Sequence, residues 1–63
     1  MAKKKDAFGD LSEGDKFTLK GRKTKWVRIR EFYDYEKMVS YNAVSQSLRL
    51  RFFQSFEKVT RVQ

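Results

Sequence analysis

Three segments of the chain alternate between apolar and basic residues, at positions 16–20, 26–30 and 48–52. Successive side chains of a β-strand point to opposite faces, so this alternation predicts strands with apolar side chains on one face and cations on the other. If the strands share a sheet, their apolar face forms the core of the protein. The predicted core residues are Phe17, Leu19, Val27, Ile29, Leu48, Leu50 and Phe52.

Turn-forming residues between these segments complete the predicted topology. Gly14 leads into the first strand, and Gly21 lies in a hairpin loop at residues 21–24, where it can take a positive φ angle. A polar turn at residues 45–47 separates the next pair of strands. We expect strands at about residues 16–20, 25–33, 38–44, 48–53 and 58–62.

The C-terminal part of the chain also fits a helix over about residues 46–61. Apolar residues fall there at spacings of four, four and three: Leu48, Phe52, Phe56 and Val59. On a helix, Arg49 and Arg51 would not share a face. The strict alternation at residues 48–52 and the β-branched and aromatic residues favour strands. The expected fold is therefore all-β, a small five-stranded barrel, and the alternative is an α+β fold in which a β-hairpin precedes a C-terminal helix.

The size of the chain limits it to one small domain. Its 63 residues bury only about 60% of the surface of the unfolded chain, so the core must be rich in large side chains, and six Phe, three Tyr and one Trp supply them. Residues 1–6, which include three consecutive lysines, are expected to be a disordered basic tail, and residues 7–63 a single domain. No apolar run approaches the roughly 18 residues of a membrane span, so we expect a cytoplasmic protein without a membrane partner.

The residue types that carry most catalysis at neutral pH are missing. The chain contains no Cys and no His, which excludes disulfides, zinc fingers and histidine-ligated metals. The glycines match no phosphate-binding loop. Four scattered carboxylates are typical of surface turns rather than of a metal site: Asp10, Asp15, Asp34 and Glu36. We therefore expect neither an enzyme nor a bound cofactor or metal.

Residues 8–17 read Phe-Gly-Asp-Leu-Ser-Glu-Gly-Asp-Lys-Phe, which resembles the F-x-D-L-x-x-G-D-x-F opening of many small phage, prophage and bacterial proteins. A Trp-Val-Arg-Ile segment, an Asn-Ala-Val segment and a short closing strand follow in the same order, so the resemblance spans most of residues 8–62. It implies an SH3-like barrel and, for a phage-encoded chain, the host cytoplasm. The chain departs from the pattern at Ser45-Gln46-Ser47, where such proteins commonly carry a glycine.

The charge distribution points to a polyanionic partner. The net charge is +7, and residues 16–30 contain seven cations and no acid. Lys and Arg neutralise phosphates, and an aromatic ring can stack on a base. We therefore predict a binding module that uses a basic sheet face and the first hairpin to bind nucleic acid, DNA or RNA. The predicted nucleic-acid-binding residues are Lys16, Lys20, Arg22, Lys23, Lys25, Trp26, Arg28, Arg30, Arg49 and Arg51.

Two other interpretations of the same residues stay open. In the first, the cations form an ordinary solvated sheet face and Trp26 packs in the core. In the second, the chain is a protein-interaction module that docks on an acidic protein, such as a host protein, through Tyr33, Tyr35 and Tyr41. Exposed strand edges would also allow a homodimer.

Overall fold

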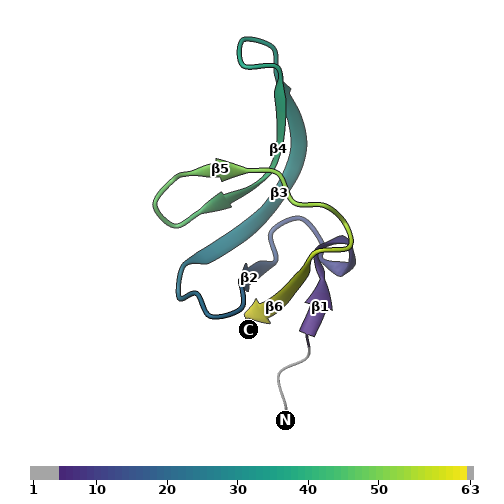
Figure 1. Cartoon of the computed structure of the whole chain (residues 1–63), viewed down its shortest axis with the longest axis vertical. Helices are drawn as coiled ribbons and strands as arrows, with labels where there is room; N and C mark the ends of the chain where they lie inside the picture. The colour runs from purple at the N-terminus through teal and green to yellow at the C-terminus, as the bar shows by residue number, and fades with distance from the viewer. Residues whose placement is uncertain (1–4, 63) are drawn as a thin grey trace.

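The computed structural model describes residues 5–62, and it is all-β, as the alternation predicted. The strands form one antiparallel sheet in the order β1-β6-β2-β3-β4-β5, with β1 and β5 at its edges (Figure 1). The sheet therefore has six strands and two open edges, where the sequence predicted five strands in a barrel. The elements are β1 (Lys5–Ala7), the 3-10 turn η1 (Phe8–Asp10), β2 (Lys16–Thr18), β3 (Lys25–Asp34), β4 (Val39–Ser45), β5 (Leu50–Arg51) and β6 (Lys58–Val62).

The C-terminal end of the described chain agrees with the predicted strands, whereas the N-terminal end differs from the predicted tail. Residues 46–61 contain β5 and most of β6, so the helical alternative for this segment is wrong. Lys5 and Asp6, which were assigned to a disordered tail, belong to β1 and pair with β6. The rest of that predicted tail, residues 1–4, lies outside the described residues.

The core is a cluster of aromatic rings centred on Phe53, which follows β5. Its ring stacks on Phe8 with the centroids 5.2 Å apart. It also meets Phe17 edge-on at 5.3 Å and Trp26 edge-on at 5.4 Å. Such pairs add about 0.5–1.5 kcal/mol each beyond the area that they bury. Within residues 5–62, the buried hydrophobic residues are Phe8, Leu11, Phe17, Trp26, Ala43, Phe53 and Val59.

The predicted core is correct at its first strand and wrong at its last. Phe17 is buried, and Leu19 packs against the core. The later members face solvent, with exposed fractions of 84% for Leu48, 44% for Leu50 and 38% for Phe52. Between these extremes, Val27 and Ile29 are only half-buried. The sheet therefore turns the aliphatic side chains of the arginine-rich segments outward.

Two large aromatic residues explain this inversion. Residues two apart on an extended strand point to the same face. Trp26 therefore shares a face with Arg28, and Phe53 shares one with Arg51. Burying one aromatic ring removes about 150–250 Å² from water, more than a single aliphatic side chain can offer. Once Trp26 and Phe53 point inward, the arginines share their face and the aliphatic residues between them turn outward.

A buried amide fixes the backbone of Phe53. Asn42 Nδ2 donates to the Phe53 carbonyl oxygen at 2.9 Å, and the Phe53 N–H donates to Asn42 Oδ1 at 2.8 Å. The side chain of Asn42 thus satisfies both backbone groups of a residue that lies beyond the last paired residue of β5. This pair of bonds places the central ring of the core.

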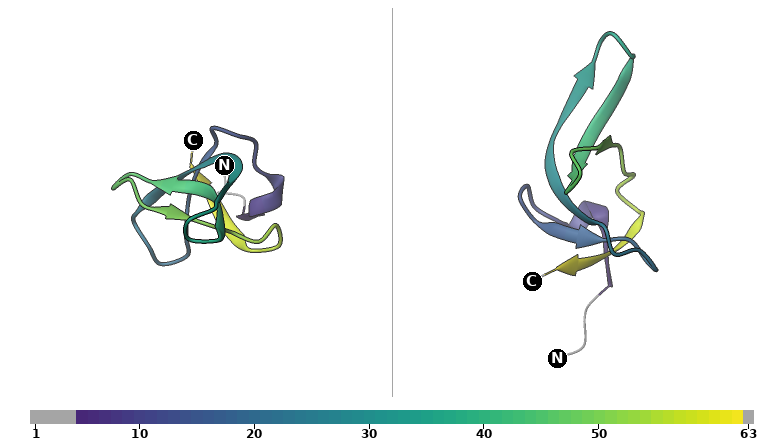
Figure 2. Two further views of the ribbon diagram at one scale, coloured as in Figure 1. Left: turned by 90° about the horizontal axis from the view of Figure 1, so that it is seen from above. Right: turned by 90° about the vertical axis from the view of Figure 1, so that its left-hand side faces the viewer.

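The β3–β4 hairpin extends well beyond the core. Arg28 lies opposite Ala43 and Phe32 opposite Tyr41, so between these pairs β3 contains two residues more than β4. This irregularity bends the ribbon. Above it the hairpin rises away from the other strands (Figure 2), and the molecule measures 43 Å along its longest axis.

Candidate functional site

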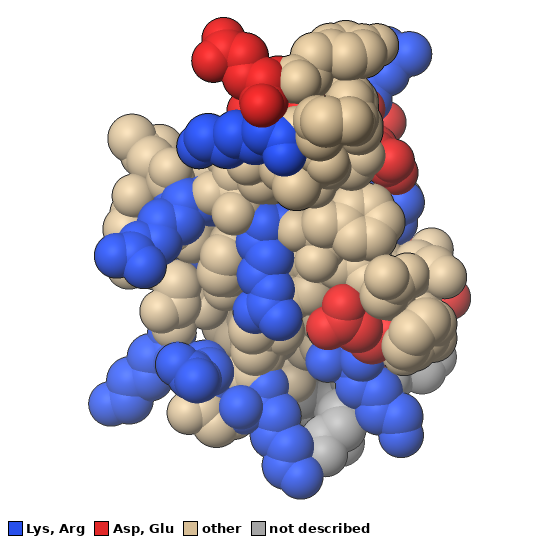
Figure 3. All heavy atoms as spheres, turned by 45° about the horizontal axis from the view of Figure 1, so that its top comes forward, with Lys and Arg blue, Asp and Glu red and all other residues tan. Residues whose placement is uncertain are grey.

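An open groove of about 560 Å³ lies between the β2–β3 loop and the β4–β5 hairpin. Its lining carries four cations and three hydroxyl groups, and it includes no carboxylate. Lys and Arg gather on the left and lower part of the molecular surface, the side on which this loop and this hairpin lie (Figure 3). The lining residues are Leu19, Lys20, Arg22, Thr24, Trp26, Ser45, Ser47, Arg49 and Arg51.

The β2–β3 loop forms one wall of the groove. Gly21 takes a φ of +73°, and the Arg22 N–H donates to the Leu19 carbonyl oxygen at 3.0 Å, which closes a tight turn. β2 ends at Thr18, so Lys20 no longer follows the alternation of the strand. The turn thus brings Lys20 to the groove.

The β4–β5 turn forms the other wall, and Ser45 organises it. Its carbonyl oxygen accepts from the Leu48 N–H at 2.9 Å, and its N–H donates to the Arg49 carbonyl oxygen at 2.8 Å. Ser45 Oγ accepts from the Arg49 N–H at 3.1 Å and lies 3.0 Å from Ser47 Oγ. The turn contains no glycine, and Leu48 adopts the left-handed conformation in its place, with a φ of +63°.

Direct hydrogen bonds connect the two walls. The Lys25 N–H donates to Gln46 Oε1 at 3.1 Å, and the Gln46 N–H donates to the Lys25 carbonyl oxygen at 3.0 Å. Lys25 begins β3, and Gln46 lies in the turn after β4. These bonds hold the β4–β5 turn against the end of the β2–β3 loop.

The floor of the groove is part of the core. Trp26 is only 9% exposed and packs edge-on against Phe53, so it gives the groove little of its ring surface. Arg51 lies over the same Phe53 ring, with Cζ 4.5 Å from the ring centroid. This cation–π contact orients Arg51 from below, while its side chain stays exposed. Trp26 is therefore a packing residue, and we do not expect a base to stack on its face.

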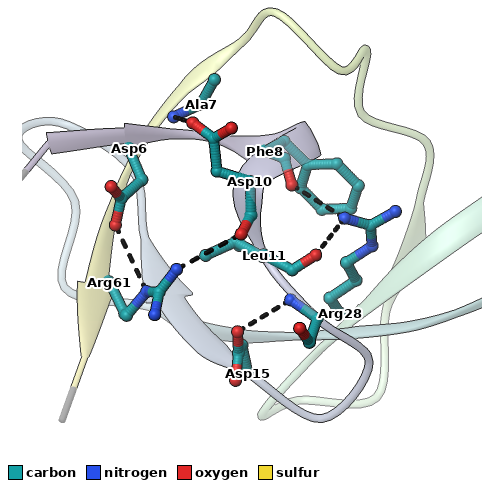
Figure 4. Close-up of polar contacts among 9 residues, drawn as sticks. Asp6, Ala7, Phe8, Asp10, Leu11, Asp15, Arg28 and Arg61 are labelled. Atoms are coloured by element: carbon teal, nitrogen blue, oxygen red, sulfur yellow. Dashed lines mark hydrogen bonds and ion pairs between the residues drawn. The ribbon is translucent and has the colours of Figure 1, made fainter.

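Arg28 and Arg61 tie the N-terminal turn to the sheet. Arg28 Nη1 donates to the carbonyl oxygens of Phe8, at 3.0 Å, and Leu11, and its Cζ lies 4.8 Å from the centre of the Phe8 ring (Figure 4). Arg61 Nη2 donates to the Asp10 carbonyl oxygen in the turn at 3.3 Å, and Arg61 Nε forms an ion pair with Asp6 Oδ2 of β1 at 3.2 Å. Within residues 5–62 this is the only ion pair, so no groove cation has a carboxylate partner in the described part of the chain.

The remaining predicted cations do not line the groove. Lys16 lies opposite Val27 and points away from the core, since its neighbour Phe17 is buried. Lys25 precedes the buried Trp26 and lies on the same outer face as Lys16. Two further predicted residues are exposed elsewhere: Lys23 and Arg30. The expectation of one flat basic face is therefore wrong, because β2 ends before Lys20 and the arginines of β3 share the face of Trp26.

The tyrosines lie apart from the groove, on the β3–β4 hairpin. Tyr33 and Tyr35 have ring centroids 4.8 Å apart, and Tyr41 pairs with Phe32 at 5.4 Å. At the turn, Asp34 Oδ1 accepts from the N–H of Glu36 at 3.0 Å.

The other aspartates singled out in the sequence also accept backbone hydrogen bonds in turns. Asp10 Oδ2 accepts from the Ala7 N–H at 3.2 Å, and Asp15 Oδ2 accepts from the Ser12 N–H at 2.8 Å. Among residues 5–62, no three acidic side chains come together as metal ligands would.

The sequence prediction missed the three hydroxyl groups of the groove, those of Thr24, Ser45 and Ser47. Their only signal in the sequence is that they lie in two turn segments that the fold brings together.

Comparison with protein-family models, with curated proteins and with solved structures gave no match. The described residues also form no helix that is long and apolar enough to span a bilayer.

Proposed function

We propose that the chain is a non-catalytic module that binds the sugar–phosphate backbone of nucleic acid in the groove between the β2–β3 loop and the β4–β5 hairpin. The observation that carries this proposal is a lining with four cations and without a carboxylate, to which Thr24 and Ser47 add exposed hydroxyl groups, while the buried Ser45 holds the turn. Phosphate oxygens accept hydrogen bonds from Arg, Lys, Ser and Thr side chains, and an uncompensated cluster of cations attracts a polyanion.

The groove favours binding without strong sequence preference. Trp26 gives little surface to it, and the remaining lining groups are typical phosphate and sugar contacts. If all four cations contact phosphates, the logarithm of the binding constant falls with the logarithm of the salt concentration with a slope of roughly −3. Single strands, which are flexible enough to follow a short groove, are the expected preferred ligand.

Two lysines offer a matched test. Lys20 lines the groove, whereas Lys16 lies on the outer face of the sheet. Fluorescence anisotropy with single- and double-stranded oligonucleotides, over a series of salt concentrations, measures affinity and slope together. Lys20→Gln should make the slope less negative by about 0.7–0.9, and Lys16→Gln, with the same change in charge, should leave it unchanged.

Two results would count against the proposal. The first is an absence of binding at low salt by protein shown to be folded. The second is an equal loss for Lys16→Gln and Lys20→Gln, which would indicate that only total charge matters.

An SH3-like architecture and a phage origin are part of the same proposal. The curling of a six-stranded antiparallel sheet around one aromatic core supports the architecture (Figure 2). The origin rests on the resemblance of residues 8–62 alone.

The second candidate function is protein binding through the tyrosines of the β3–β4 hairpin. Tyr35 is 83% exposed, and Tyr33 packs beside it. Asp34 and Glu36 flank Tyr35, so a partner of this tip should be basic, whereas the sequence had suggested an acidic one.

A further inference from the structure

The β3–β4 hairpin beyond the bend, residues 30–41, forms a two-stranded arm that cannot bury its own apolar side chains. The exposed fractions are 83% for Tyr35, 74% for Met38 and 42% for each of Phe32, Tyr33 and Val39. Adjacent residues of a strand point to opposite faces, so the neighbours Phe32 and Tyr33 place aromatic rings on both faces of the arm. An isolated two-stranded ribbon is marginally stable in water. We therefore expect a binding partner to cover the apolar side chains of the arm.

Neighbouring strands do not reach the arm in the described structure. β2 pairs with β3 only at residues 25–27, and β5 pairs with β4 only at residues 43–44. Backbone donors and acceptors along both outer edges of residues 30–41 are consequently available, in the described part of the chain, to whatever covers the arm.

The charge of the arm limits the choice of partner. The tip carries Asp34 and Glu36 around Tyr35, and the arm also contains Glu31. With Arg30 and Lys37, the arm has a formal net charge of −1 in a chain whose total is +7. Acidic side chains lie at the top of the surface, around the tip, with basic side chains beside them (Figure 3). Carboxylates at the tip repel phosphates and anionic lipids, so the partner that fits is a basic protein surface.

One such surface is present on the molecule itself, in the basic groove. The tip and the groove lie at different places along the 43 Å axis, the tip at the top of Figure 1 and the groove-forming loop and hairpin at the left and lower left. An arm therefore cannot reach the groove of its own chain. We propose that the arm of one copy docks in the basic groove of a second copy.

The expected association is weak. Docking would bury much of the exposed surface of Tyr33 and Tyr35, whose rings lie 4.8 Å apart, on the order of 250 Å² on the arm side. A standard protein interface buries about 800 Å² per partner. Charge pairs between the tip and the groove must supply part of the binding energy, so salt weakens the complex. Two copies that exchange arms form a closed pair with two-fold symmetry, whereas one-sided docking continues head to tail.

Sedimentation velocity of the intact protein, without nucleic acid, tests the proposal. At low salt the weight-average sedimentation coefficient should rise between micromolar and millimolar protein, and high salt should abolish the rise. Glu36→Lys should abolish it as well. The matched control is Glu13→Lys, which makes the same charge change at an exposed residue of the turn before β2 and should keep the association.

A charge exchange makes the test specific. Glu36→Lys gives a basic tip, and Arg22→Glu gives a groove with an acid in its wall. Each variant alone should associate less than the original chain. In an equimolar mixture, each variant offers the arm that the other groove accepts, so association should return.

The aromatic part of the arm has its own control. Tyr35→Ser should weaken association, while Phe56→Ser, at a similarly exposed aromatic residue after β5, should not. Thermal melts of each variant establish that it is folded.

Several outcomes would overturn this proposal. They are a monomer at every concentration, equal effects of Glu36→Lys and Glu13→Lys, and a mixture that associates no better than its components. Because no nucleic acid is present, these outcomes are independent of the proposed function. If both proposals hold, added oligonucleotide should dissociate the complex, since both ligands occupy the same groove.

Discussion

Replacing Leu48 by asparagine or glycine should stabilise the protein. Leu48 has a φ of +63°, and its side chain is almost fully exposed. A residue with a Cβ atom pays about 1–2 kcal/mol for the left-handed conformation, which asparagine tolerates better. Leu48→Asn should therefore raise the free energy of unfolding by about 1 kcal/mol. Leu48→Gly should gain roughly half as much, because glycine increases the entropy of the unfolded chain by an equivalent of about 0.5–1 kcal/mol.

Urea denaturation followed by the fluorescence of Trp26, the single Trp of the chain, measures this change. A thermal melt by circular dichroism should show a midpoint about 4–8 °C higher for Leu48→Asn. Leu48→Ala keeps the Cβ atom and is the control, with an expected change within about 0.5 kcal/mol. If Leu48 instead packed in the core, as the alternation of residues 48–52 predicted, Leu48→Ala would cost about 2–5 kcal/mol. A loss of that size would refute the exposed position of Leu48 in the turn and the outward orientation of the aliphatic side chains of residues 48–52.

Two further substitutions test one buried contact and one surface contact in the same denaturation assay. Asn42→Ala leaves both backbone groups of the buried Phe53 without their partners and should cost about 2–5 kcal/mol, so a loss below about 1 kcal/mol would contradict the role of the amide. Gly9→Ala would bring a Cβ atom to 3.0 Å from Ser55 Cβ and 3.1 Å from the Ser55 carbonyl oxygen. It should cost about 1–3 kcal/mol, and an unchanged midpoint would show that the segment around Ser55 moves away freely.

Local alternation was sufficient to predict the strands, but not which face of each strand is buried. The predicted segments at residues 16–20, 25–33, 38–44, 48–53 and 58–62 each contain or closely match a strand. The positions of Trp26 and Phe53 indicated the buried face, because both rings are buried and each shares a face with neighbouring arginines. A prediction that weights residues by the area they can bury would place the face with the aromatic rings in the core, rather than the face with the aliphatic side chains.

Alternation predicted some of the groove residues, such as Trp26, Arg49 and Arg51, but not the groove itself, because other lining residues lie in turns where alternation ends. Lys20 lies two residues beyond the end of β2, and Ser47 lies in the turn after β4. Their proximity depends on the bonds between Lys25 and Gln46, which join positions 21 residues apart. The strand β1 was missed for a similar reason, since its pairing with β6 joins the two ends of the described chain.

The place of β6 in the sheet has a consequence for synthesis on the ribosome. The strand β6, the last of the described strands in chain order, lies between β1 and β2 and pairs with both. Until residues 58–62 leave the exit tunnel, β1 has no partner strand and Val59 is missing from the core. The nascent chain must therefore stay soluble with β1 unpaired and one edge of β2 open, and completion of the sheet depends on contacts between distant residues, which are slow to form.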